Sequence, residues 1–192
     1  MRTLTVVSVA HTRKELGDWE KKVVSIRQHI YGILPTEQFF ADIEDYWKEV
    51  EYRIFETYAQ KPDILPRLHI FMDSLPITNG VILEAIIRDE LQEKSPMCVI
   101  AAALRKKGAR IHGTENPQLL IEEHAYWKGR LERDEPEDVP KERRMLQDRD
   151  AAIAARINAI VPDEESALLF IGALHRVQDA FHTDPHWTVR DL

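Results

Sequence analysis

Short apolar runs that alternate with longer amphipathic segments set the pattern of this chain. The most continuous run opens the stretch Ala167–His175 and follows the polar residues Asp163–Ser166. An apolar run of this length, bounded by polar residues, predicts a strand that is buried on both faces, as in the middle of an α/β sheet. Weaker runs of the same kind predict further strands at residues 3–10, 67–72 and 109–112, and a short edge strand at 186–190.

The segments between these strands carry apolar residues at helical spacing. The clearest case runs from Thr36, a suitable N-cap, to about Gln60, and its apolar residues recur at alternating intervals of three and four. Ser95 and Pro96 start another helix, and Gly108 suits the position after its end. Further helices are expected at residues 81–93, from Pro117 onward and at 141–160.

Strands that alternate with helices predict an α/β fold. We expect one domain spanning residues 1–192, with a mixed, largely parallel central sheet of about four to five strands flanked by helices. Residues 133–142 interrupt the pattern with two prolines and an acidic run, which predicts an exposed polar loop.

Composition narrows the classes of function. The 192 residues carry a formal net charge of −7, which argues against a general nucleic-acid binder because such proteins usually present a basic face. The one cysteine, Cys98, allows no disulfide within the chain, and its apolar neighbours favour an inert core thiol over a nucleophile. The sequence shows neither a leader pattern nor an apolar run long enough to span a bilayer. We therefore expect a cytoplasmic protein without a membrane partner, acting on a small-molecule or peptide substrate and compatible with a homo-oligomer.

Two histidines stand where expected strands end. His175 closes the apolar stretch described above, and His11 follows the strand at residues 3–10. Open α/β sheets bind ligands beyond the carboxyl ends of their strands, so both imidazoles are candidates for one site. A histidine at such a position acts as a general base, as the partner of a nucleophile or as a metal ligand, unless it is only a structural residue.

A cation and a carboxylate are expected near the same strand ends. Arg149 falls on the apolar stripe of the helix at 141–160. It either faces the sheet and needs an anionic or carbonyl partner, or lies along the apolar surface with its head in water. Its natural partner is Glu115, which comes three residues after the strand at 109–112, unless that carboxylate only shapes the turn before the next helix. Two residues of that next helix are weaker candidates: Glu123 and His124.

These positions form an ordered set of short motifs. Gly172–His175 is a Gly-x-x-His at a strand end, and Arg149–Ala154 precedes it as a helical segment headed by arginine. The pair resembles the C-terminal signature of the TraB/TIKI proteins, within the erythromycin-esterase/ChaN-like superfamily. The superfamily pattern also has a first strand that ends in histidine, and Ser8–His11 matches it with serine in place of glycine. The pattern further has a central glutamate, which is best matched in Gly113–Glu115. Proteins of this kind include a proposed metal-dependent protease, a histidine-dependent esterase and a haem-binding lipoprotein.

The resemblance implies a site at the strand ends more firmly than it implies a reaction. Our hypothesis is a hydrolase, of esterase or metallopeptidase type, with His11, Glu115, Arg149 and His175 around one cleft. One histidine activates water, or His11 and His175 hold a divalent metal ion. Glu115 acts as base or ligand, and Arg149 stabilises the negative charge that develops in the reaction. The alternative is a non-enzymatic protein that binds a small ligand or a partner on the same scaffold.

The C-terminal tail offers a separate candidate for metal binding. His182 and His186 are ligand types four residues apart. However, Pro185 disfavours the helical turn that would bring their rings to one face, and no cysteine joins them. A zinc site made from these residues alone is therefore the weaker expectation.

Overall fold

The computed structural model describes residues 1–13, 37–133 and 138–192, apart from the side chain of Leu131. Within those residues, five strands form one sheet in the order β3-β2-β4-β1-β5, and all neighbouring strands are parallel. The predicted α/β fold is confirmed, and the sheet is parallel throughout rather than mixed. The strands are β1 (Arg2–Val9), β2 (Leu68–Met72), β3 (Arg110–His112), β4 (Ser166–Gly172) and β5 (Trp187–Asp191).

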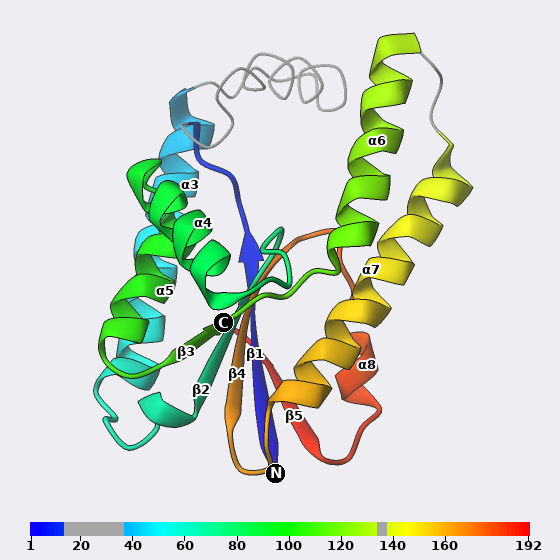
Figure 1. Cartoon of the computed structure of the whole chain (residues 1–192). Coiled ribbons are helices and arrows are strands. Elements are labelled where there is room, and N and C mark those ends of the chain that lie inside the picture. The colour runs from blue at the N-terminus through cyan, green and yellow to red at the C-terminus, as the bar shows by residue number, and fades with distance from the viewer. Residues whose placement is uncertain (14–36, 134–137) are drawn as a thin grey trace.

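Helices cover both faces of this sheet (Figure 1). One layer consists of α3 (Glu37–Ile54), α4 (Gly80–Gln92) and α5 (Pro96–Lys106). The other face is covered by α7 (Val139–Ile160) and the short α8 (Asp179–His182), with α6 (Pro117–Arg133) beside α7. No helix among the described residues combines the length and the apolar character that a membrane span needs.

Strand β4 is apolar at successive positions because both of its faces are covered. Leu168 and Phe170 belong to the core cluster under α3, α4 and α5. Ala167, Leu169 and Ile171 belong to the cluster under α7 and α8. All five side chains are buried, as the uninterrupted run predicts for a central parallel strand.

The predicted stripe of α3 is confirmed. Its apolar residues are all buried against the sheet: Phe40, Ile43, Trp47, Val50 and Ile54. Beyond the helix, the turn Phe55–Ala59 has π-helical geometry and carries Tyr58, whose hydroxyl lies 2.6 Å from that of Thr5 on β1. The expected N-cap Thr36 lies outside the described residues.

The polar loop expected at residues 133–142 was predicted too long. Arg133 ends α6, and α7 already begins at Val139. Asp138 caps α7 by accepting a hydrogen bond from the backbone N–H of Lys141 (3.2 Å). Pro140 lies in the first turn of α7, where the missing N–H has no helical partner in any case. Residues 134–137 lie outside the described part of the chain.

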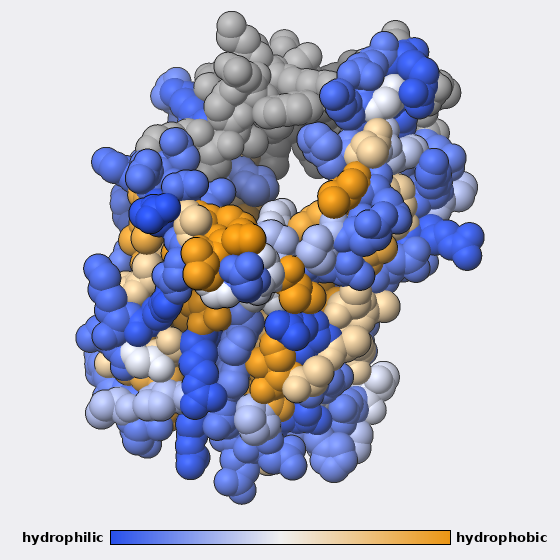
Figure 2. Space-filling model, viewed as in Figure 1, coloured by the Kyte–Doolittle hydropathy of each residue, from blue (hydrophilic) through white to orange (hydrophobic). Residues whose placement is uncertain are grey.

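The connections place a switch point at the centre of the sheet. The helices that follow β1 and β2 pack in the α3–α5 layer, whereas β4 leads to α8 in the opposite layer. Strand β4 lies between β1 and β2 in the sheet. The chain after β4 therefore continues on one face of the sheet, while the chain after each of its two neighbours continues on the opposite face. The crevice at such a point, beyond the carboxyl ends, is where open α/β sheets bind ligands. Figure 2 shows a hollow between the α4 side and the α6 side of the molecule, over this end of the sheet.

Candidate functional site

Arg149 lies at the centre of a cluster of three carboxylates. Its Nη2 lies 2.6 Å from Glu115 Oε1 and 3.0 Å from Asp73 Oδ1, and its Nη1 lies 2.6 Å from Glu123 Oε2. Its Nε also donates to Glu115 Oε2 at 3.3 Å. The side chain is buried and paired with Glu115, so the structure shows the inward one of the two orientations considered for Arg149.

Glu115 reaches this cluster because two loops run side by side at the end of the sheet. After β3, the chain continues along the segment that follows β2, and Glu115 forms a parallel bridge with Pro76. Gly113 permits this approach, since a Cβ there would overlap the Pro76 carbonyl and lie 2.7 Å from the Cα of Ile77. Thr114 fixes the register by accepting a hydrogen bond from the backbone N–H of Met72 (2.9 Å). The sequence Gly-Thr-Glu thus holds one carboxylate in a fully buried position.

The cluster contains an excess of negative charge, with three carboxylates around one guanidinium. Burial raises the pKa of Glu115, and the Asp73 carboxylate adds to this rise, while Arg149 opposes it. Burial also works against the charge of Arg149, but hydrogen bonds and charges from the carboxylates outweigh it and raise the pKa of the guanidinium. Arg149 therefore stays charged, and the raised pKa of Glu115 favours a protonated carboxyl at that position.

Asp73 connects this cluster to the middle of the sheet. It directly follows β2, and its Oδ2 accepts a hydrogen bond from the backbone N–H of Gly172, the last residue of β4 (3.0 Å). Its Oδ1 receives Arg149 and, at 3.4 Å, the hydroxyl of Ser74. The carboxylate is thereby fixed from two strands and one helix.

His175 is held by Asp150, a carboxylate of α7 that is not a partner of Arg149. Its Nδ1 lies 2.5 Å from Asp150 Oδ1, and Asp150 Oδ2 accepts the backbone N–H of Arg176 at 2.8 Å. An acceptor at Nδ1 selects the tautomer that carries its proton there and leaves Nε2 free to accept a proton. Within the described residues, no hydrogen bond to Nε2 is found. The imidazole is buried and fixed in orientation, although its strand ends three residues earlier, at Gly172.

Gly172 is the point where the two carboxylate systems meet. A Cβ at this glycine would lie 3.1 Å from Asp73 Oδ2 and 3.6 Å from His175 Cδ2. The imidazole and the Asp73 carboxylate thus both lie close to one backbone position. The structure therefore brings Glu115, Arg149 and His175 to the same end of the sheet.

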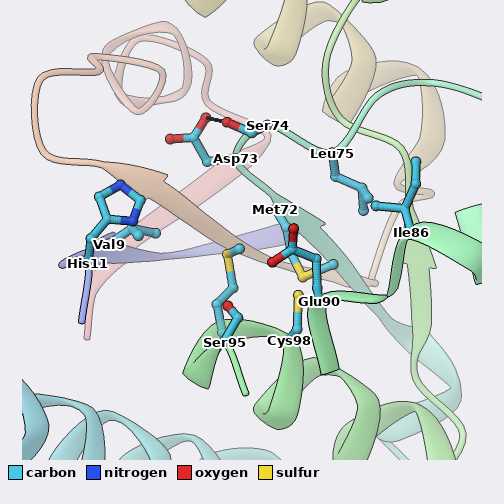
Figure 3. Close-up of a pocket in the computed structure, with 11 residues that line it drawn as sticks. Val9, His11, Met72, Asp73, Ser74, Leu75, Ile86, Glu90, Ser95 and Cys98 are labelled. Carbon is cyan, nitrogen blue, oxygen red and sulfur yellow. Dashed lines mark hydrogen bonds between the residues drawn. The ribbon is translucent and has the colours of Figure 1, made fainter. Parts of the chain in front are cut away.

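His11 lies apart from these contacts, in the wall of a cavity. It is exposed, and it lines a space of about 230 Å³ together with Asp73 and Ser74. Figure 3 shows His11 and Asp73 around this cavity, with Ser95 and Cys98 approaching from the start of α5. Asp73 is thus the residue that the cavity and the arginine cluster share.

The described residues contain no group of three or more His, Cys, Asp or Glu side chains arranged to hold a metal ion. The expectation that His11 and His175 form a metal site therefore gains no support from the structure. In the tail, His182 and His186 are exposed. Cys98 is buried and not in a disulfide, as expected for a core thiol, although it also reaches the cavity wall.

Sequence reasoning missed Asp73 and Asp150 as site residues. Asp73 directly follows an apolar strand, which is the same signal that singled out His11 and His175. Asp150 lies off the apolar stripe of its helix, and only its place beside Arg149 in the Arg-Asp motif pointed to it. Glu123, a weaker candidate, is a direct partner of Arg149.

Comparisons of this chain with protein-family models, with curated proteins and with solved structures find no match.

Proposed function

We propose that this protein is a hydrolase acting on an ester or amide bound beyond the carboxyl ends of β1, β2 and β4. One observation carries the proposal. An imidazole aligned by a carboxylate, His175 with Asp150, stands next to Asp73, which Arg149 and a strand-end N–H hold in place. The order of these motifs along the chain, which resembles the TraB and erythromycin-esterase proteins, supports the same class of reaction.

In this proposal, His175 is the general base. Asp150 keeps the proton on Nδ1, so that Nε2 takes a proton from a water molecule as its oxygen attacks the substrate carbonyl carbon. The positive charge that forms on the ring is stabilised by the Asp150 carboxylate, at 2.5 Å from Nδ1. General bases of this kind contribute about 10²- to 10⁴-fold to a rate.

The carboxyl cluster supplies the proton for the leaving group. Burial raises the pKa of Glu115, and the neighbouring Asp73 carboxylate adds to this rise, which favours a protonated Glu115. Glu115 is fully buried, and Asp73 reaches the cavity, so the proton passes to the substrate through Asp73. As the bond from the carbonyl carbon breaks, the leaving oxygen or nitrogen takes this proton. Solvent then restores it to the cluster and removes the extra proton from His175.

Arg149 has a different role from the one expected from the sequence. Four hydrogen bonds already engage its guanidinium, which has five N–H donors in all. We therefore assign it a positioning role, in which it holds Asp73 and Glu115 together and limits their mutual repulsion. The charge that develops on the substrate is instead met by His11, whose exposed imidazole lines the cavity beside Asp73.

The alternative function is ligand binding without turnover. Ion pairs within the cluster already engage most of the N–H donors of Arg149, as in a purely structural network. The cavity beside Asp73 is present whether or not a reaction takes place in it. A protein of this class would bind a small molecule in the cavity and leave it unchanged.

A substrate screen with matched histidine variants separates the two functions. The wild-type protein, His175→Gln and His182→Gln are assayed on p-nitrophenyl acetate, p-nitrophenyl hexanoate, p-nitrophenyl phosphate and a chromogenic peptide amide. His182 is exposed, so its variant controls for the loss of one imidazole. We expect hydrolysis of an ester or amide that falls at least 100-fold in His175→Gln and is unchanged in His182→Gln. Absence of hydrolysis by the wild-type protein, or full activity of His175→Gln, would contradict the proposal.

A further inference from the structure

The cavity that Asp73 and His11 line extends to the beginning of α5. Its volume is about 230 Å³, and most of its wall is apolar. The apolar side chains come from the strand ends and from α4 and α5: Val9, Met72, Leu75, Ile86 and Met97. A space with such walls favours the apolar part of a ligand over several water molecules.

Ser95 places an unsatisfied hydroxyl in this wall. The residue is 1% exposed, and its Oγ has no hydrogen-bond partner among the described residues. Ser95 is the N-cap of α5, a position where a serine oxygen usually accepts a hydrogen bond from the first turn of its helix. Here the side chain makes no such bond. A buried hydroxyl without a partner costs free energy, which a bound oxygen or nitrogen atom would recover.

The surroundings of Ser95 favour a neutral oxygen atom as its partner. The hydroxyl lies at the N-terminus of an 11-residue helix, where backbone N–H groups and the helix dipole attract an acceptor. Asp73 lies in the same cavity wall and belongs to the cluster in which three carboxylates surround one guanidinium. A carboxylate or phosphate would be repelled by this excess of negative charge, whereas the oxygen of an alcohol or carbonyl would not.

We propose that this cavity binds a neutral, mainly apolar molecule of about eight non-hydrogen atoms, whose oxygen accepts a hydrogen bond from Ser95 Oγ. The size follows from the volume, since a water molecule occupies about 30 Å³ of liquid and 230 Å³ corresponds to about eight such volumes. The other end of the ligand faces Asp73 and His11. That this end carries the bond to be cleaved rests on the proposed function, but the binding itself does not.

Two probes of equal chain length test the inference without any turnover. Hexan-1-ol and hexanoate are titrated into the folded, full-length protein, and dissociation constants are obtained from amide chemical shifts in two-dimensional NMR spectra. We expect hexan-1-ol to bind with shifts centred on residues 95–98 and hexanoate to bind at least tenfold more weakly. Ser95→Ala should weaken hexan-1-ol binding about three- to tenfold, as expected for one lost hydrogen bond, and the distant Ser166→Ala should not change it.

A further variant examines the volume. Ile86→Trp, which enlarges a partly buried side chain of the cavity wall, should abolish binding of both probes while the amide spectrum stays folded. Three results would overturn the inference: no hexan-1-ol binding up to its solubility limit, equal affinities of wild type and Ser95→Ala, or shifts centred away from residues 95–98. Hydrolysis in the substrate screen without hexan-1-ol binding would overturn this inference alone.

Discussion

Arg149 and Asp150 are adjacent on α7, yet their side chains enter two different networks at the same end of the sheet. Arg149 binds Asp73 and Glu115, which follow β2 and β3. Asp150 binds His175, which follows β4. One turn of one helix thereby aligns a carboxylate cluster and an imidazole, and both Asp73 and His175 lie close to Gly172.

Removing Arg149 should be among the most destabilising changes at the site. Arg149→Met leaves up to three carboxylates without their cation, and one of them, Glu115, is fully buried. Breaking a buried ion pair in this way costs about 3–5 kcal/mol. Urea denaturation of this variant should show such a loss, whereas Arg144→Met, at an exposed position of the same helix, should change stability by less than about 0.5 kcal/mol. Similar losses in both variants would show that Arg149 does not neutralise the cluster.

Glu115→Gln should lower the free energy of unfolding at neutral pH far less than Arg149→Met does. It should also change how this free energy depends on pH. The pKa of Glu115 is raised by burial, so between about pH 4.5 and the raised value the unfolded chain is ionised while the folded protein keeps its proton. The wild type therefore loses stability as the pH rises through this window, by up to about 1 kcal/mol per pH unit. Urea denaturation at several pH values should show a flatter profile for Glu115→Gln. Parallel profiles for the two proteins would mean that Glu115 is ionised throughout.

Gly172→Ala tests the close approach of Asp73 and His175. The new methyl group would lie 3.1 Å from Asp73 Oδ2, which Arg149 and the Gly172 N–H restrain. We expect a loss of about 1–3 kcal/mol in thermal or urea unfolding. Gly80→Ala, at the open start of α4, meets no atom within 4 Å and should stabilise the protein by up to about 1 kcal/mol. Equal effects at the two glycines would rule out steric crowding at Gly172.

His112 should make the fold sensitive to acid. Its ring stacks on His69, with Nε2 lying 2.9 Å from the Nδ1 of that residue. Burial lowers the pKa of His112 to about 4, and the nearby His69 and two arginines add to this effect. As the pH falls from 6.5 towards 4, His112 takes up a proton in the unfolded chain but stays neutral in the folded protein, so the free energy of unfolding decreases across this window.

The histidine variants His112→Gln and His124→Gln measure this contribution. Because His112 is only partly buried, we expect it to account for about 1–2 kcal/mol of the acid-induced loss. His112→Gln should lose that much less stability than the wild type between pH 6.5 and 4.5, in urea denaturation at each pH. His124 is exposed, and its variant should follow the wild-type curve. An acid profile of His112→Gln that matches the wild type would place the sensitivity elsewhere.

Much of the fold was predictable because the sheet is central and doubly covered. Continuous apolar runs such as Ala167–Ile171 occur where both faces of a strand are buried, and the stripe of α3 showed one buried face. The ends of helices were harder to predict from the sequence. Prolines such as those at 136 and 140, with charged residues around them, are typical both of a loop and of the start of a helix. The α7 helix therefore began earlier than predicted.

Part of the site was also predictable, because two of its residues stand out against an apolar stripe or an apolar strand. Arg149 was found because a charged residue on an apolar stripe needs a partner, and Glu115 because it follows a strand. Asp73 and Asp150 were missed because aspartate is common in turns and on solvated helix faces, so their sequence context carries little information. Only the strand order, which places β4 between β1 and β2, shows that Asp73 lies next to His175. No local pattern determines that order.

In the proposed hydrolytic site, Asp150 orients His175 as the base, and kcat/KM of Asp150→Asn is the measurement that decides whether it does. Asparagine keeps the size of the side chain but removes the charge that fixes the imidazole, while Asp179→Asn removes the same charge from an exposed position. On the best substrate of the screen, we predict a loss of about 10²-fold or more for Asp150→Asn and an unchanged rate for Asp179→Asn. Equal rates for wild type and Asp150→Asn, with both proteins folded, would contradict the account.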